Sequence, residues 1–293
     1  MPKRNHHTEP NFYLKGFHSD SDEGNPKIWV YEKGKPFYEG KTEQLQNPKH
    51  RTTKVTAVER DVYSFTKEDG AKDYEKYENL LRDNFEEPAK PMLEKLRRFE
   101  MIDDGEKKVF SRYITSMKMR GNFGKQLFYN VSHRILIDEQ NNLRSQGIDE
   151  KEIEKISIES VENRKKEKDG ERDKKRMIEL SDKSDFVCRL NWIFLLAPNS
   201  YEFMTSDNPV YWEELNSQRA RLLFPIASKI CLLATSQPYP KHKSWKVREN
   251  GFVEIDSAAI EGIREKIVRE ARFKVYFSRK AEWLVRFVNS RLN

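Results

Sequence analysis

The chain has 293 residues, of which 36% are hydrophobic and 35% are charged, and its formal net charge is +7 at pH 7. This length is enough to bury a core without the help of a disulfide or a metal ion. No apolar stretch approaches the length that spans a bilayer, and residues 1–30 lack the apolar core of a secretion signal, so a membrane protein is excluded and we expect a cytoplasmic one.

The two cysteines, Cys188 and Cys231, both lie in apolar runs. In a reducing compartment they predict buried free thiols and not a disulfide. The 55 basic residues outnumber the 48 acidic ones, which favours an anionic partner, although the mixture predicts a surface that is not uniformly basic. Nucleic acid is therefore the candidate partner, a membrane is not, and protein partners stay open.

The N-terminal part has the composition of a small antiparallel sheet. β-Branched and aromatic residues fill 28–31, 52–58 and 62–65, with Gly, Pro and Asn at the turns between them. After Gly70 the apolar period becomes that of a helix, with a stripe of Tyr74, Tyr77, Leu81 and Phe85. That helix is expected to end or kink near Pro88 and Pro91.

The middle of the chain is predicted to be helical. One segment runs over 92–99, and residues 105–136 predict a long helix with a weak point at Gly121-Asn122. Residues 149–183 form the most charged region. Because acidic and basic residues are interleaved there, the pattern favours a solvated helical excursion with i,i+4 ion pairs over an RNA-binding arm.

After Ser184 the sequence becomes apolar and strand-like again. Short strands are predicted at residues 186–197, 201–204, 210–212, 222–226 and 230–234. The chain closes with a helix through Ile260, Ile263 and Ile267, a strand at 275–277 and a final helical segment. The fold class predicted is a single α+β domain over 1–293, with a mainly antiparallel sheet from N- and C-terminal segments and a long helical insertion between them.

Two polar motifs lie near opposite ends of the chain, and both could contribute to one site. The first is His6-His7-Thr8-Glu9-Pro10, followed by the apolar residues of 12–17. Adjacent imidazoles on an extended segment point to opposite faces, so at most one is expected to reach a given site. The alternatives are a disordered tail or a histidine bonded in the core, but the apolar residues that follow can anchor the segment.

The second motif is Ser206-Asp207-Asn208-Pro209, after the predicted strand 201–204. A carboxylate at a strand end, beside an amide and before a proline, is a common place for a metal ligand or a general base. An ordinary turn uses the same residue types, and taken alone the motif favours the turn.

Three further residues are candidates for chemistry. Glu78 and Glu86 lie eight positions apart on the first predicted helix, offset by roughly 80°, so both could face one cleft. Arg120, at the expected helix break, could clamp a phosphate or a carboxylate. Each has an ordinary alternative as a solvated surface charge. The sequence contains no phosphate-binding glycine loop, zinc-thiolate pair or Rossmann fingerprint.

At these motifs the chain resembles a family known as domain of unknown function 4238. Its members carry an N-terminal His-His-x-x-Pro followed by a Phe/Tyr-Leu-rich stretch, here His6-His7-Thr8-Glu9-Pro10 with Phe12-Tyr13-Leu14. They also carry a later Ser-Asp-Asn-Pro, here at 206–209. The resemblance implies that both motifs are family features and supplies no reaction.

The first functional hypothesis is a metal-assisted hydrolase of phosphodiesters, similar to a nuclease. Asp207, with His6 or His7 and Glu78 or Glu86, would hold Mg²⁺ or Mn²⁺; a remaining histidine would be the general acid or base, while Arg120 and Asn208 would steady phosphate oxygens. This hypothesis predicts that Asp207→Ala and His7→Ala each abolish cleavage and leave the melting temperature nearly unchanged.

The second hypothesis is a non-catalytic nucleic-acid or protein-binding module. In it His6, His7 and Asp207 form a buried hydrogen-bond network that pins the N-terminus to the sheet. Bonds from Asp207 to neighbouring backbone N–H groups, without an open cleft beside it, favour this second reading. An open pocket lined by His, Asp and Glu side chains favours catalysis.

Overall fold

The computed structural model describes residues 5–19, 25–33, 36–39, 42–45, 48–60, 65–66, 72–73, 76–120, 144–146, 148–149, 152–153, 183–213, 219–238 and 244–290. They form an α+β fold with two main sheets and helices between the N- and C-terminal strands, which confirms the predicted class. No helix in these ranges is long and apolar enough to cross a membrane.

The larger sheet has six strands in the order β11-β12-β13-β9-β15-β14. Its neighbours are antiparallel except for β15 and β9, which run parallel. The strands are β9 (Asn191–Leu196), β11 (Tyr211–Glu213), β12 (Arg221–Ala227), β13 (Ile230–Thr235), β14 (Lys246–Val247) and β15 (Val253–Glu254).

The second sheet has four antiparallel strands in the order β10-β16-β2-β5. Here the two ends of the chain meet, as predicted, in β2 (Lys27–Glu32), β5 (Lys49–Thr52), β10 (Thr205–Ser206) and β16 (Lys274–Phe277). Three strand pairs complete the set: β1 (Asn5–His7) with β6 (Val58–Arg60), β3 (Pro36–Glu39) with β4 (Thr42–Leu45), and β7 (Phe65–Thr66) with β8 (Lys72–Asp73).

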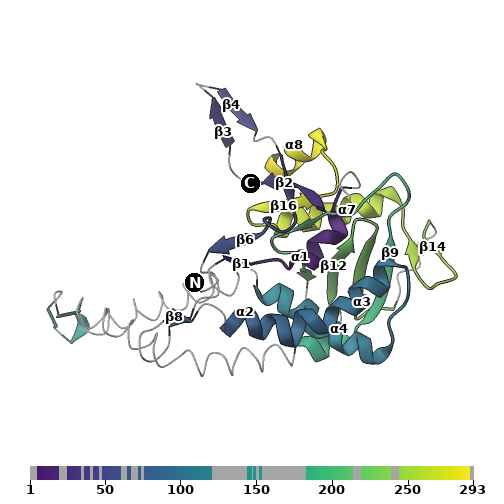
Figure 1. Ribbon diagram of the computed structural model, residues 1–293, viewed down its shortest axis with the longest axis horizontal. Coiled ribbons are helices and arrows are strands. Elements are labelled where there is room, and N and C mark those ends of the chain that lie inside the picture. Colours follow the sequence, from purple (N-terminus) through teal and green to yellow (C-terminus); the bar gives the residue numbers. More distant parts are fainter. Residues whose placement is uncertain are drawn as a thin grey trace.

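Helices cover both faces of the larger sheet. Figure 1 shows α3 (Glu87–Arg97) and α4 (Asp104–Arg120) along one side and α7 (Ser257–Glu270) along the other. Further helical segments are α1 (Asn11–Leu14), the 3₁₀ turn η1 (Lys15–Phe17), α2 (Lys76–Leu81), the π-helical turn η2 (Arg82–Glu86), residues 183–189 and α8 (Glu282–Ser290). Asp256 caps α7 by accepting a bond from the Ala259 amide at 2.8 Å.

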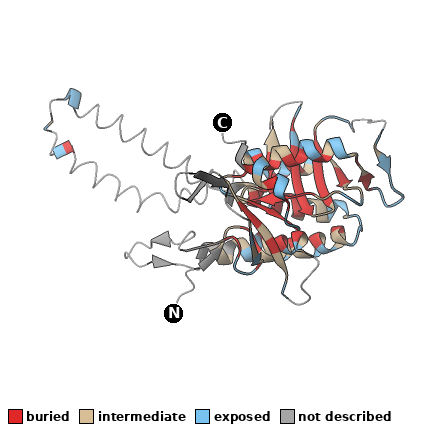
Figure 2. Cartoon of the chain, turned by 90° about the horizontal axis from the view of Figure 1, so that it is seen from above, coloured by how far each residue is buried: buried red, intermediate tan, exposed pale blue. Residues whose placement is uncertain are grey.

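The central strands alternate between two hydrophobic clusters. On β13, Leu232 packs into the cluster beneath α3 and α4, whereas Leu233 packs into the cluster beneath α7. Both faces are therefore apolar, and the strand reads as a continuous hydrophobic run because helices cover it on each side. Figure 2 shows the buried residues concentrated in these strands and on the helix faces that meet them.

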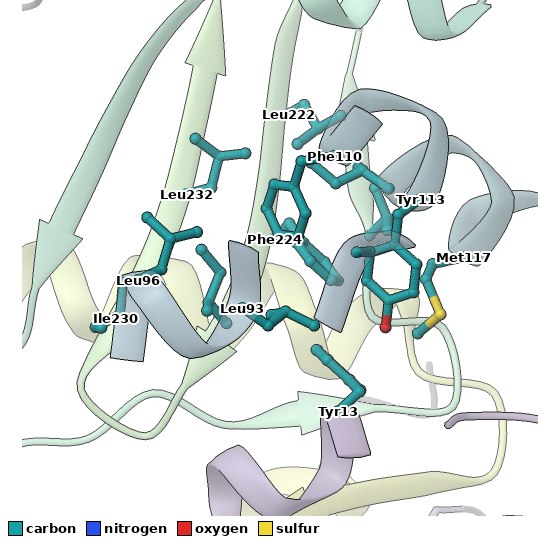
Figure 3. Packing of buried hydrophobic residues seen from close by; sticks show 14 of the residues in the cluster. Tyr13, Leu93, Leu96, Phe110, Tyr113, Met117, Leu222, Phe224, Ile230 and Leu232 are labelled. Carbon is teal, nitrogen blue, oxygen red and sulfur yellow. The ribbon is translucent and has the colours of Figure 1, made fainter. Parts of the chain in front are cut away.

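Aromatic rings fill the cluster on the α3–α4 side (Figure 3). The rings of Tyr13 and Phe224 stack with centroids 5.3 Å apart, and Phe110 and Tyr113 of α4 each lie 6.2 Å from Phe224. Since Tyr13 belongs to α1, the N-terminal motif ends inside this core.

The predicted kink at the prolines is a π-helical turn. Pro88 has no N–H for the i−4 carbonyl, and immediately before it the Glu87 amide donates to Arg82 O, five residues back. The helix therefore continues through η2 into α3, so the second helical segment begins at Glu87 and not at Met92.

Other strand predictions were wrong in part. Residues 53–57 form a turn and not a strand, because Ala57 has φ of 58° and Thr56 Oγ1 bonds back to Thr52 O at 2.8 Å. Residues 183–189 are helical, so the strand there begins at Asn191, and 201–204 are irregular. The predictions for 62–64, 121–136, Gly121-Asn122 and most of 149–183 lie outside the described residues.

Candidate functional site

The first motif leads the N-terminus into the core through backbone pairing. β1 pairs with β6, and Thr8 continues the contact by donating both its amide and its Oγ1 toward Ala57 O, at 2.8 and 3.0 Å. The positive φ of Ala57 costs on the order of 1 kcal/mol, which these contacts offset. Pro10 O then accepts the Tyr13 and Leu14 amides and starts α1.

Glu9 is the most deeply buried carboxyl of this region, with 3% of its surface exposed. Its Oε2 lies 3.2 Å from the Tyr276 hydroxyl and 3.0 Å from Thr8 Oγ1. Burial, together with the nearby Asp207 carboxylate, raises the pKa of Glu9 to about 8, against the smaller opposing effects of Thr8, Tyr276 and Lys274.

The number of protons available for the hydrogen bonds around Thr8 also favours a protonated Glu9. Thr8 Oγ1 has one proton but lies 3.0 Å from both Glu9 Oε2 and Ala57 O. A neutral Glu9 can donate its proton to Thr8 Oγ1, which leaves the Thr8 proton for Ala57 O. An ionised Glu9 would compete with Ala57 O for the same proton.

The two motifs meet at the junction of the two sheets. Tyr13 donates to Pro225 O at 2.8 Å, and its hydroxyl lies 2.6 Å from Thr205 Oγ1. Because Tyr13 has only one proton, Thr205 is the donor of the shorter bond. Thr205 also pairs with Tyr276 across the sheet, so the partners of Tyr13 and Glu9 are neighbours.

Arg97 of α3 fixes the other end of the first motif. Its guanidinium donates to Phe12 O and Tyr13 O, both at 3.0 Å, and so satisfies carbonyls of α1. Gly16 lies against this group: an added Cβ would come 2.7 Å from Ile226 O and 2.6 Å from the Arg97 guanidinium. Only glycine fits this close approach without a shift of the backbone.

The second motif binds the connection between α7 and β16. The Asp207 carboxylate accepts from the amides of Arg272, Phe273 and Lys274 at 2.9, 2.8 and 3.2 Å. Burial raises the pKa of Asp207, and these three amides oppose that effect. Three of the roughly four acceptor positions of the carboxylate are thus taken by the protein's own backbone.

Asn208 acts on the same connection. Its side-chain Nδ2 donates to Glu270 O and to Glu270 Oε2, both at 3.2 Å. Lys118 of α4 bonds the same Oε2 at 3.0 Å and Val210 O at 2.9 Å. The carbonyls at the end of α7 are completed by Lys33, whose Nζ donates to Val268 O at 2.8 Å and Ala271 O at 2.7 Å.

The family follows from comparison with known proteins. Residues 5–281 match the family described as "Protein of unknown function (DUF4238)". The chain belongs to the DUF4238 family. A search of curated proteins and a search of solved structures gave no match.

In this DUF4238 protein the predicted site residues divide into three groups. Asp207 and Asn208 lie at the junction of the motifs, bound to backbone as described. His7, Glu78 and Glu86 are half-buried, with His7 Nδ1 and Glu78 Oε2 enclosed by protein. His6, in β1, and Arg120, at the end of α4, have side chains outside the described part of the chain.

The metal site predicted around Asp207 stays a prediction. Its hydrogen-bond donors are the amides of 272–274, and His7, Glu78 and Glu86 are not among its partners. Within the described ranges no group of three His, Cys, Asp or Glu side chains is arranged to hold a metal ion.

The two cysteines are free thiols in the structure. Cys231 is buried, and burial raises the pKa of its thiol; Cys188 is half-buried. Cys231 lies opposite Pro225, whose carbonyl accepts from Tyr13, and its thiol is one of the lesser groups that, after burial, raise the pKa of Tyr13.

Sequence reasoning missed Glu9, Tyr276 and Lys33 as members of this network. The sequence does mark Glu9, since it stands inside the first motif beside Pro10. No sequence feature marks Tyr276 or Lys33, because their roles depend on the pairing of β16 with β2 and on the position of the end of α7.

Proposed function

We propose that this DUF4238 protein is a non-catalytic nucleic-acid-binding module whose two motifs hold the fold together. The engagement of Asp207 with three backbone amides supports this choice over a hydrolase, because the carboxylate already has acceptor positions filled by the chain itself. Asn208 is likewise engaged by the chain itself, because its side-chain Nδ2 donates to Glu270 O.

The observation that carries the nucleic-acid assignment is the basic segment 48–57, which contains β5 and the turn after it and in which Lys49, Arg51 and Lys54 are exposed. The segment has Lys49, His50, Arg51 and Lys54 and no acidic residue. Lys49 pairs with Glu32 at 3.0 Å, whereas Arg51 and Lys54 are exposed and form no ion pair with the described residues. Exposed cations such as these can neutralise phosphates and release counterions.

Fluorescence anisotropy with labelled single-stranded and duplex oligonucleotides tests the proposal. We expect the Arg51→Ala/Lys54→Ala double variant to bind about tenfold more weakly than the unmodified protein. Its salt dependence should also fall, by about 0.7 to 0.9 in slope for each lost phosphate contact.

The matched control is Arg82→Ala/Arg98→Ala. It removes the same charge from α2–α3, where Arg82 pairs with Asp83 and Arg98 with Glu100. Equal weakening by both double variants, or no binding of any oligonucleotide, would overturn the proposal.

Metal-assisted phosphodiester hydrolysis is the second candidate, and one observation favours it. Glu9 is a buried carboxyl with a pKa raised to about 8, and such groups are common at catalytic sites. Thermal shift with Mg²⁺, Mn²⁺ and Zn²⁺, beside Asp207→Ala, separates the two functions. A stabilisation by one ion that the variant loses, together with cleavage of an oligonucleotide, would replace the binding module with the hydrolase.

A further inference from the structure

A row of side chains crosses the smaller sheet on the face opposite Tyr276. Trp29 of β2 is paired with His50 of β5, and their rings stack with centroids 4.6 Å apart and an angle of 9°. Lys280 Nζ lies 6.0 Å from the centre of the Trp29 ring. The indole therefore contacts both an imidazole and a cation.

The imidazole at the end of this row is held in place. Ser19 Oγ lies 2.9 Å from His50 Nε2, and the indole supports one face of the ring. β5 is the edge strand of the sheet as described, so no described strand lies beyond His50, whose side chain is half-buried. A fixed, partly exposed ring at a sheet edge can accept a further flat group at little entropic cost.

Exposed cations lie near this stack. Arg51 follows His50 on the edge strand, with its side chain toward the other face of the sheet, Lys54 is in the next turn, and Lys280 lies beside the Trp29 ring. A flat ring with exposed cations near it is a combination by which proteins bind single-stranded nucleic acid: bases stack on the ring while the backbone phosphates meet the charges.

We infer that the His50–Trp29 stack is a platform for an unpaired base, and that this protein prefers single-stranded to duplex nucleic acid. The inference rests on the proposed nucleic-acid binding and names the form of the partner. In a duplex both faces of each base are covered by its neighbours, so the platform would have nothing to stack on without unstacking the helix.

Two ligands with the same phosphates separate stacking from charge. Fluorescence anisotropy is measured with an oligothymidylate of about 12 nucleotides, with an abasic oligonucleotide of equal length, and with a duplex. We expect the oligothymidylate to bind about tenfold more tightly than the abasic strand, because the stacking of one base on an aromatic ring is of the size, about 1.4 kcal/mol, that corresponds to tenfold.

The variants are His50→Ala and His50→Phe. His50→Ala should lose the preference for bases and keep the affinity for the abasic strand, whereas His50→Phe, a neutral flat ring, should restore the preference. Melting temperatures of both variants establish that they are folded.

Equal affinity for the oligothymidylate, the abasic strand and the duplex would overturn the inference and leave the proposed function standing. Persistence of the preference in His50→Ala would likewise overturn it. No binding of any of the three ligands would overturn both.

Discussion

At the scale of single residues, Glu9 combines deep burial with a chemical environment that accepts only one protonation state well. It lies next to the Asp207 carboxylate, and its neighbour Thr8 can donate a single proton. Both conditions favour the neutral acid. A neutral Glu9 joins β16 to the N-terminal motif through Tyr276, whereas an ionised Glu9 would place a second negative charge in the same junction.

The free energy of unfolding should therefore fall as the pH rises toward the folded-state pKa of Glu9. The folded pKa of about 8 lies above the ordinary value of 4.5, so the folded protein binds the proton more tightly than the unfolded chain. The stabilising contribution is complete below pH 4.5 and is lost as the pH approaches 8, with a slope of up to about 1.4 kcal/mol per pH unit. The raised pKa of Asp207 acts in the same direction. Urea unfolding between pH 5 and 9 measures this slope.

Glu9→Gln is the matched variant for this measurement, because glutamine keeps an oxygen for Tyr276 and cannot ionise. We expect it to flatten the pH dependence and to be more stable than the unmodified protein above pH 8. Identical pH profiles for the two proteins would show that Glu9 does not titrate in this range.

At the scale of elements, the second motif acts on the connection between α7 and β16. Asp207 binds the amides of 272–274, Asn208 binds Glu270, and Lys33 completes the carbonyls at the end of α7. Residues 270–274 leave a helix and enter a strand, so several of their N–H and C=O groups lack a partner within the helix or the sheet. Side chains of distant segments supply those partners.

Asp207→Ala should destabilise the fold by about 3 kcal/mol or more, since it removes charge-assisted bonds and leaves partly buried amides without an acceptor. Asp207→Asn keeps one oxygen and should cost about 1 to 2 kcal/mol. Urea unfolding gives the free energies, and hydrogen exchange should become faster at 272–274. Asp185→Ala, at an exposed position, is the control. An unchanged melting temperature for Asp207→Ala would instead favour the catalytic reading of this carboxylate.

The elements that sequence predicted well are those with a clear period or composition. Ile260, Ile263 and Ile267 mark the buried face of α7, and the β-branched and aromatic residues of 28–31 mark β2. The turn at 53–57 was missed because the positive φ of Ala57 depends on Thr8, a residue far away in the chain. The helix at 183–189 was missed because its apolar residues are equally typical of a strand.

The candidate site shows the same limit. Both motifs could be located from residue types alone, and the structure joins them through Tyr13 and Thr205. What the residue types could not give is the number of acceptor positions that remain free. That number depends on the amides of 272–274, which are distant in sequence and carry no side-chain signal.

At the scale of the whole molecule, one sheet serves two hydrophobic clusters. β9, β12 and β13 give alternate residues to each cluster, so neither cluster can form without the same three strands. The smaller sheet repeats this arrangement, with Val30 on one side and Tyr31 on the other. Shared strands couple the helices on both faces, and we expect the described core to unfold as one cooperative unit.

Neighbouring residues on β13 test that coupling. Leu232 is fully buried in the cluster beneath α3 and α4, and Leu233, 6% exposed, is buried in the cluster beneath α7. Leu232→Ala and Leu233→Ala should each cost about 2 to 5 kcal/mol. Both should move the same single urea transition, followed by tryptophan fluorescence and far-UV circular dichroism. Two separate transitions, each sensitive to only one of the variants, would mean that the clusters fold independently and that the shared strands do not couple them.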